Sequence, residues 1–373
     1  MRLFSSPSEV GDFTWLCAML VFESALAGAL ADVGLAPREA AEEIWSVCDD
    51  ADRFDLDALS EGTARDGTPV PALLAQLRSR LSDEAKAVLH LGATSQDVVD
   101  TAAMLVARRA STTLLSDLDA AGDAAAALAD RHRADLAAGR TLLQQASPIT
   151  FGLRAANWLG GLDDAAARLT AVRDERLALQ FGGAVGTLAA LDDRGLAVAE
   201  VLAGRLDLPA APVPWQSNRS RPVELAAALG QAAGAAGKVG ADVVLLAQTE
   251  VGEVAEGQPG ASSSMPHKRN PTAAVTAVAA ARRTPGLVAT MLAAMPGEQE
   301  RAAGAWQAEA ETLSELLRFT GVGVAAVRRS LEGLEVFPDR MRANLEVDGD
   351  LGATDELIDR AIAAHRARVE RSA

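Results

Sequence analysis

The sequence is poor in the residues that build disulfide frameworks, metal centres and aromatic cores. It contains two cysteines, four histidines and no tyrosine, and aromatic residues make up 3% of the chain. Cys17 and Cys48 are too few for a disulfide framework and have no metal-ligand spacing. Hydrophobic residues nevertheless make up 49% of the chain, mostly as alanine, leucine and valine. This composition favours closely packed helices with small residues at their contacts.

Positive charge and targeting signals are also scarce. The net charge of −16 argues against nucleic acid or an anionic membrane surface as a partner. Residues 1–10 lack the basic-then-apolar layout of a signal peptide, and we expect no apolar run of membrane-spanning length. The sequence therefore predicts a soluble, cytoplasmic protein, in which an anionic substrate would have to be attracted by a local cluster of cations.

Helical periodicity extends through almost the whole chain. Shorter helices are predicted at 12–34, 40–51, 71–81 and 193–206, whereas 54–71, rich in Gly, Pro and Asp, is predicted to be irregular. Long helices are predicted at 102–135, 153–181, 223–256, 272–292 and 308–331. Because short polar breaks join them, the five long helices predict a bundle. We expect a small N-terminal helical domain (1–110), a central long-helix bundle (111–340) and a short C-terminal helical remnant (341–373).

The densest polar stretch is residues 257–271, which contains three consecutive serines and the run His-Lys-Arg-Asn-Pro. Its prolines and glycines predict a loop. Backbone N–H groups near the loop apex, the charge of Lys268 and the amide of Asn270 could together receive a carboxylate or a phosphate. The alternative is a solvated basic surface loop.

A second polar segment, 90–101, has the features of a helix start. Thr94 or Ser95 could cap the helix, and Asp97 would favour its positive end. The same N-terminus could also bind an anion. His90, which stands alone before a glycine, could instead be structural.

Two further breaks, 141–150 and 215–221, also carry amides, hydroxyls or cations. Gln144 and Gln145 could simply cap backbone groups, and Arg219 could be solvated. Residues 182–187 form a glycine-rich break without the strand and lysine of a phosphate-binding loop, so tight turning and close backbone approach explain it better. Loops at one end of a bundle can converge in space, and we expect these polar segments to do so.

Two motifs identify a family resemblance. Residues 262–271 resemble the Ser-Ser-x-Met-Pro-x-Lys-x-Asn-Pro loop of the fumarase/aspartase superfamily, and 90–101 resemble its His-x-Gly-x-Thr-Ser-x-Asp-x-x-Asp-Thr motif. The resemblance extends to about residue 345. It implies an all-α fold with a central five-helix bundle and a truncated C-terminal domain. It also implies a homotetramer whose active sites draw loops from three subunits.

The same resemblance implies roles for individual residues. Ser262, with Ser263 as the alternative, would be the catalytic acid/base, and Lys268 would assist it. Residues implied to bind the substrate are His90, Thr94, Ser95, Gln96, Thr141, Gln144, Gln145, Arg219, Met265, Asn270, Arg301 and Trp306. Trp306 could equally be an ordinary core aromatic residue.

Two segments, 140–146 and 298–309, resemble the lactone-forming branch of the superfamily. Leu142 stands where most of its lyases have a histidine acid/base, and Val275 stands where adenylosuccinate-type lyases have the glutamate that orients it. The branch implies a small tricarboxylate substrate whose own carboxylate adds to a double bond, with no metal or cofactor. The rival interpretations are an adenylosuccinate-type lyase and a non-catalytic helical scaffold.

Overall fold

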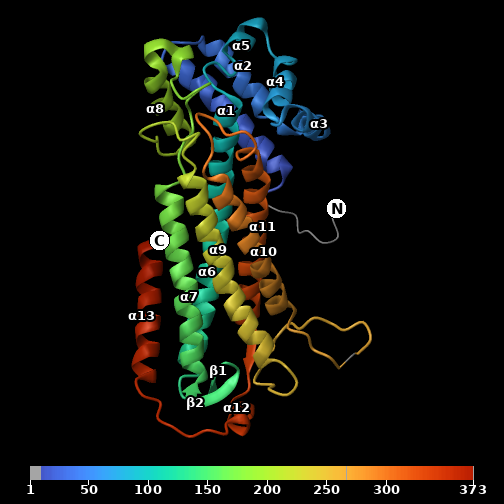
Figure 1. Ribbon diagram of the computed structural model, residues 1–373, viewed down its shortest axis with the longest axis vertical. Coiled ribbons are helices and arrows are strands. Elements are labelled where there is room, and N and C mark those ends of the chain that lie inside the picture. The colour runs from blue at the N-terminus through green and yellow to red at the C-terminus, as the bar shows by residue number, and fades with distance from the viewer. Residues whose placement is uncertain (1–9, 266, 373) are drawn as a thin grey trace. The chain divides into compact units, whose positions relative to one another are not determined.

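The computed structural model describes residues 10–265 and 267–372. Its described residues are mainly helical (Figure 1), which confirms the predicted all-α class. The chain divides into two compact units, each built from separate stretches of sequence. Unit 1 comprises the described residues of 1–110, 172–226 and 287–318, and unit 2 those of 111–171, 227–286 and 319–373. The division at residues 110 and 340 stays a prediction.

Unit 1 contains the short helices and one end of each long helix. Its complete elements are α1 (Asp12–Asp32), α2 (Arg38–Cys48), η1 (Ala51–Arg53), α3 (Leu56–Asp66), α4 (Val70–Arg78), α5 (Asp83–Val88), η2 (Ala189–Arg194) and α8 (Gly195–Leu206). Large aliphatic side chains on α1, α2 and α4, such as Leu26, Ile44 and Leu73, are fully buried. They form the core expected for a chain with so few aromatic residues.

Helix α1 departs from the sequence prediction. By length and composition it could span a membrane, so the expectation that no run reaches that length is wrong for this segment. However, 67% of its most apolar window is buried within the protein, and Glu23 lies at its centre. Both features are typical of a core helix. The cytoplasmic location stays a prediction.

Helix α3 occupies part of the segment predicted to be irregular, and that prediction is wrong. The Asp55 carboxylate accepts hydrogen bonds from the N–H groups of Asp57 and Ala58, which caps the helix. The helix ends at Gly67, whose φ of 72° is left-handed. The polar residues that suggested a loop therefore serve as the start and the end of a short helix.

Unit 2 contains the larger part of the five long helices, and their existence confirms the predicted bundle. These helices are α6 (Ser95–Arg131), α7 (Phe151–Glu175), α9 (Ser220–Leu246), α10 (Thr272–Ala294) and α11 (Gln307–Glu332). Glycine allows α9 and α10 to approach closely, because a Cβ at Gly237 would lie 2.4 Å from the Cβ of Ala281. Small residues thus pack these helices, as the composition indicated.

Two two-stranded antiparallel sheets also lie in unit 2, and neither was predicted. Strand β1 (Leu136–Thr141) pairs antiparallel with β2 (Gln144–Thr150), and β3 (Val254–Glu256) pairs with β4 (Leu334–Val336). The first sheet is a hairpin, and it occupies the break predicted at 141–150. The second joins segments about eighty residues apart, which no local pattern reveals.

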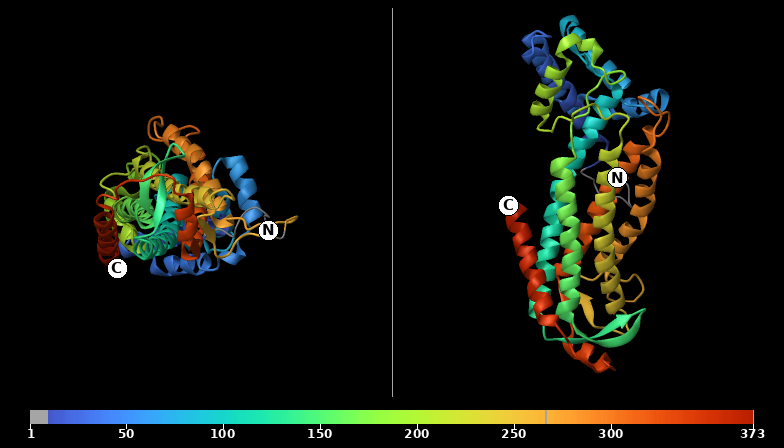
Figure 2. Two further views of the ribbon diagram at one scale, coloured as in Figure 1. Left: turned by 90° about the horizontal axis from the view of Figure 1, so that it is seen from below. Right: turned by 60° about the vertical axis from the view of Figure 1, so that its left-hand side comes forward.

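Two C-terminal helices, α12 (Pro338–Asn344) and α13 (Thr354–Ser372), complete unit 2. Both ribbon views place α13 beside α6 and α7 (Figures 1 and 2). His365 of α13 is buried, with Nδ1 2.8 Å from Asp163 and Nε2 3.1 Å from Asp123. The hydrogen bond to Asp163 raises the pKa of His365 above its ordinary value. The imidazole therefore attaches α13 to the bundle through two carboxylates, one on α7 and one on α6.

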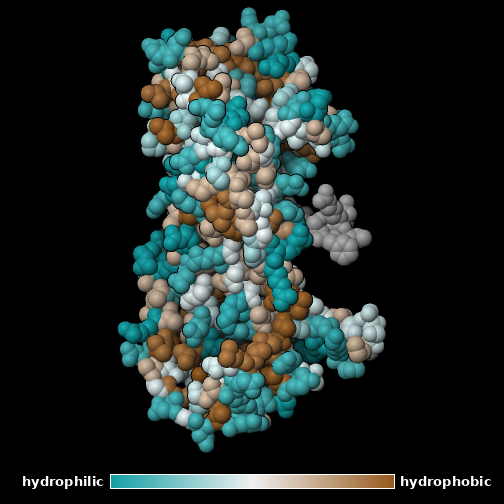
Figure 3. Space-filling view, viewed as in Figure 1, coloured by the Kyte–Doolittle hydropathy of each residue, from teal (hydrophilic) through white to brown (hydrophobic). Residues whose placement is uncertain are grey.

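The surface is consistent with this packing. On the face drawn in Figure 3, hydrophilic residues separate several small groups of apolar ones. Two of the most exposed large apolar side chains are Leu142 (97% exposed) and Leu143 (71%), at the turn of the β1–β2 hairpin.

Candidate active site

The predicted helix start at 94–97 is present in unit 1, and α6 begins at Ser95. Asp97 is fully buried and accepts hydrogen bonds from the backbone N–H groups of Thr94 (3.0 Å), Gly182 (3.0 Å) and Gly183 (2.9 Å). Burial raises the pKa of Asp97 to about 6, although these bonds act in the opposite direction. The carboxylate thus ties the glycine-rich loop to the start of α6.

Through Asp97 that loop lies against the predicted helix start, which the sequence did not indicate. Gly183 has a φ of 70°, and a Cβ there would lie 2.9 Å from the carbonyl oxygen of Gly92. The close backbone approach confirms the interpretation of residues 182–187 as a tight turn. No sequence signal links these glycines to the helix start, because the link is their hydrogen bonds to Asp97, which only the structure shows.

The structure brings together two predicted site residues, Gln96 and Arg301. Gln96 is buried, and its Oε1 accepts a hydrogen bond of 3.0 Å from Arg301 Nε. Its Nε2 donates to the carbonyl oxygen of Gln216 (2.8 Å). Arg301 also donates to the carbonyl oxygen of Ala184 (3.1 Å). The segment that resembles the lactone-forming branch therefore lies against the start of α6, where an anion site was predicted.

Arg219 and Trp306 lie nearby in unit 1, within a buried network. Arg219 donates to both oxygens of Asp100 (2.6 and 2.9 Å) and to Glu309 (3.0 Å through Nε), and Trp306 Nε1 donates to Asp100 (3.0 Å). Burial alone would lower the pKa of Arg219, but the carboxylates of Asp100 and Glu309 raise it above its ordinary value. Burial raises the pKa of Glu309. Arg219 and Trp306 thus both have partners within the protein, and their contact with the substrate stays a prediction.

His90 has a partner from the core helix. Its Nδ1 lies 2.6 Å from Oε1 of Glu23, which is buried on α1. His90 itself adopts a φ of 63°, in the left-handed region that few non-glycine residues occupy. Sequence reasoning did not identify Glu23, because it appeared only as one residue within an apolar helical stripe.

In unit 2, the serine-rich segment forms the predicted loop between β3 and α10. The N–H of Gly260 donates to Asn270 (2.8 Å) and the N–H of Asn270 donates to Gly260 (3.2 Å), which closes the base of the loop. Ser262 is half-buried, and its Oγ accepts a hydrogen bond of 3.1 Å from the N–H of Met265. Ser263, Met265 and Lys268 are exposed. Pro266 lies outside the described residues.

The start of α10 is anchored by Glu256. This buried carboxylate accepts hydrogen bonds from the N–H groups of Ala273 (3.1 Å) and Ala274 (2.8 Å), where the positive end of the helix favours it. The N–H of Gly257 donates to Gly333 (2.7 Å). The two ends of the serine loop are therefore held, while its tip is open to solvent.

The β1–β2 hairpin carries the remaining predicted residues. Thr141 and Gln144 are exposed and flank its two-residue turn. Gln145 Nε2 donates to the carbonyl oxygen of Asn344 (2.9 Å), and its Oε1 accepts from the N–H of Glu346 (3.1 Å). Gln145 thus satisfies backbone groups, one of the two roles considered from the sequence.

The predicted residues fall into two groups. The group in unit 1 is His90, Thr94, Ser95, Gln96, Arg219, Arg301 and Trp306, and the group in unit 2 is Thr141, Gln144, Gln145, Ser262, Ser263, Met265, Lys268 and Asn270. Their convergence on one substrate stays a prediction. Among the described residues, no group of three or more His, Cys, Asp or Glu side chains could hold a metal ion.

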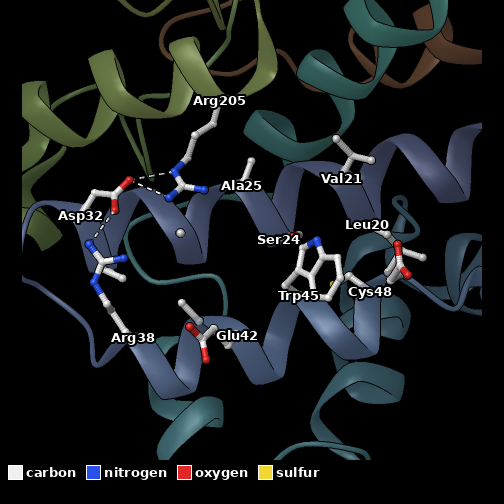
Figure 4. Close-up of a pocket in the computed structure, with 14 residues that line it drawn as sticks. Leu20, Val21, Ser24, Ala25, Asp32, Arg38, Glu42, Trp45, Cys48 and Arg205 are labelled. Carbon is white, nitrogen blue, oxygen red and sulfur yellow. Dashed lines mark hydrogen bonds and ion pairs between the residues drawn. The ribbon is translucent and has the colours of Figure 1, made fainter.

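A separate cleft of about 480 Å³ in unit 1 contains none of the predicted residues. It lies between α1 and α2, beside Arg205 of α8 (Figure 4). Asp32 accepts from Arg205 (2.6 Å) and is 3.5 Å from Arg38, and Trp45 projects from α2. The two arginines already share one carboxylate, so the cleft offers no free anion site.

Comparison with known proteins places the chain in a family. Residues 6–286 match the lyase family. The crystal structure of 3-carboxy-cis,cis-muconate lactonizing enzyme from Pseudomonas putida superimposes with a TM-score of 0.93 at 35% identity, covering 98% of both chains. The chain therefore belongs to this lyase family and has the fumarase/aspartase-type fold.

Two curated relatives carry different names. The 3-carboxy-cis,cis-muconate cycloisomerase of Bradyrhizobium diazoefficiens is 46% identical over 342 residues, covering 90% of this chain and 75% of that protein. The nitrosuccinate lyase of Streptomyces davaonensis is 41% identical over 356 residues, covering 92% of this chain and 75% of that protein. Family membership is thus clear, whereas these names alone leave the substrate open.

Proposed function

We propose that the protein is a 3-carboxy-cis,cis-muconate cycloisomerase, acting in the breakdown of protocatechuate and other aromatic compounds through the β-ketoadipate pathway. The observation that carries this proposal is the hydrogen bond between Arg301 and Gln96, because it joins the segment that resembles the lactone-forming branch to the predicted anion site at the start of α6. The identity to the Bradyrhizobium cycloisomerase supports it. Leu142, where the superfamily resemblance expects the histidine of ordinary lyases, also favours it over an elimination that needs a second acid/base.

The proposed reaction is an intramolecular addition. One substrate carboxylate oxygen forms a C–O bond to a carbon of the diene, the π bond breaks, and the neighbouring carbon takes up a proton. All three carboxylates are ionised near pH 7, so a trianion becomes a dianionic lactone and one proton is consumed per turnover. The nucleophile belongs to the substrate, and the reaction as proposed needs no cofactor.

The protein must then supply one proton and stabilise negative charge. We assign the proton to Ser262, because the N–H of Met265 already points at its Oγ and would stabilise the alkoxide left after transfer. Lys268 and Asn270 on the same loop, with Thr94, Ser95 and Arg301 in unit 1, would hold the carboxylates and the enolate-like intermediate. His90 and Gln96 would complete the carboxylate site, and Thr141, Gln144 and Met265 would line it.

We further propose that the active site is completed by assembly into a homotetramer. Ser262, the proposed proton donor, belongs to unit 2. Thr94, Ser95 and Arg301, which would hold the carboxylates, belong to unit 1. In an assembly, unit 1 of one copy and unit 2 of another can face the same substrate. Sedimentation of the active enzyme tests this, and an active monomer would contradict it.

The activity is tested by mixing purified protein with 3-carboxy-cis,cis-muconate. Ultraviolet absorbance should fall as the conjugated diene is lost, and a pH indicator in weak buffer should report uptake of one proton per lactone formed. In deuterated water, one deuteron should appear on the carbon that gains the proton. Turnover of nitrosuccinate or adenylosuccinate, with the muconate unchanged, would favour a lyase instead; inactivity of the folded protein on all three would favour the scaffold.

A further inference from the structure

Glu23 is the only charged residue of α1 between its two terminal aspartates. It is 1% exposed, among buried neighbours that include Phe22 and Leu26. Its Oε2 is buried and has no hydrogen-bond partner among the described residues. A carboxylate in such surroundings destabilises the fold, so its presence points to a function.

The partner of Glu23 identifies that function. Its Oε1 lies 2.6 Å from Nδ1 of His90, whose side chain is 14% exposed. A carboxylate at Nδ1 determines which ring nitrogen carries the proton and fixes the orientation of the ring. For the other nitrogen, Nε2, the described part of the chain provides no hydrogen-bond partner. Glu23 therefore holds the imidazole through Nδ1, while Nε2 is left available to bind another group.

The backbone of His90 begins the turn that leads into α6, where an anion site was predicted. The carbonyl oxygen of His90 accepts from the N–H of Ala93 (3.2 Å), and that of Thr94 accepts from the N–H of Asp97 (3.0 Å). These bonds form the turn that leads into α6. His90 retains a φ of 63° in spite of the strain, which indicates that the turn and the Glu23 contact together hold it there.

We propose that Glu23 is a positioning residue for the substrate site. It binds Nδ1 of His90 and orients the ring so that Nε2 faces the substrate, where Nε2 can donate to a carboxylate when both ring nitrogens carry protons. This inference rests on the proposed function, because it concerns the same carboxylate site. Glu23 itself would not touch the substrate, and its effect would pass entirely through His90.

A double-mutant cycle tests the proposal. Glu23→Gln and His90→Gln should each raise the KM for the muconate by roughly tenfold or more. The double variant should be no worse than His90→Gln alone, because Glu23 then has nothing to orient. Glu42→Gln, an exposed change on α2, should leave KM unchanged. Unchanged KM in Glu23→Gln, or losses that multiply in the double variant, would overturn the proposal.

Two readouts are independent of the reaction. The chain has four histidines, so nitrogen NMR of histidine-labelled protein gives few ring signals. Glu23→Gln should shift the signal that disappears in His90→Gln and leave the other histidines unchanged; an unshifted His90 signal would refute the pairing. Glu23→Met should also match or exceed the wild-type melting temperature. A less stable variant with normal KM would show a merely structural role.

If the muconate is not turned over, the proposed function fails, and the same cycle is measured with tricarballylate, an unreactive tricarboxylate. Weaker binding of this probe by Glu23→Gln and His90→Gln, without further loss in the double variant, would support the positioning role alone. Equal affinity in wild type and Glu23→Gln would overturn it.

Discussion

Arg301 donates through Nε to Oε1 of Gln96 at 3.0 Å, across 205 positions of sequence. Because Gln96 is buried and also bound to Gln216, it offers the guanidinium a fixed acceptor and restricts its rotation. The orientation of Arg301 is thus set before any substrate arrives, which reduces the entropy lost on binding.

Replacing Arg301 by lysine should therefore weaken substrate binding although the charge remains. Lysine cannot reproduce the planar fork that bonds to both Gln96 and Ala184. We expect KM for the muconate to rise roughly 10- to 100-fold, the range for losing a charged hydrogen bond. Steady-state kinetics measure this, with the exposed Arg282→Lys as control. A KM within twofold of wild type would remove Arg301 from the site.

Substitution of the proposed proton donor should affect turnover rather than binding. Ser262→Ala should lower kcat by about 10²- to 10⁴-fold with little change in KM, because the hydroxyl acts in the transition state. Ser263→Ala is the matched control and should retain most activity. If Ser263→Ala were the inactive variant, the donor would be the neighbouring serine.

The turn of the β1–β2 hairpin is strained and should be improvable. Leu142 and Leu143 have φ values of 50° and 64°, and a two-residue turn of this kind favours Asn-Gly. The double substitution Leu142→Asn, Leu143→Gly should raise the free energy of unfolding by about 1–2 kcal/mol. Urea unfolding measures it. Leu196→Asn, at another exposed leucine, should bring no gain; equal gains would mean that exposure, not strain, is responsible.

The attachment of α13 should weaken as the pH rises. The pKa of His365 is raised above its unfolded value of 6.5 by Asp163, so the stabilisation is complete below pH 6.5 and is lost as the pH passes the folded value. Wild type should exceed His365→Gln in melting temperature most clearly near pH 6, and the gap should narrow by pH 9. A gap that widens with pH would contradict this sign.

The serine loop and the helix start at Ser95 could be predicted because each depends on residues adjacent in sequence. The Gly260–Asn270 closure and the hydrogen bond from the Thr94 N–H to the Asp97 carboxylate both arise within the motifs themselves. The two small antiparallel sheets could not be predicted in this way. Strand β3 pairs with β4 although the whole of α10 and α11 lies between them in the sequence, and the exposed leucines at the β1–β2 turn resemble no turn signal.

The sequence by itself determined the helical class, the long-helix bundle and the identity of the two polar motifs, since helical periodicity and motif spacing are local properties. Only the tertiary structure decided the partners of the polar groups. Glu23 lies 67 positions from His90, and Arg219 lies 119 and 90 positions from Asp100 and Glu309. A buried charge is tolerated only where folding brings an opposite group within hydrogen-bonding distance, and no local pattern contains that information.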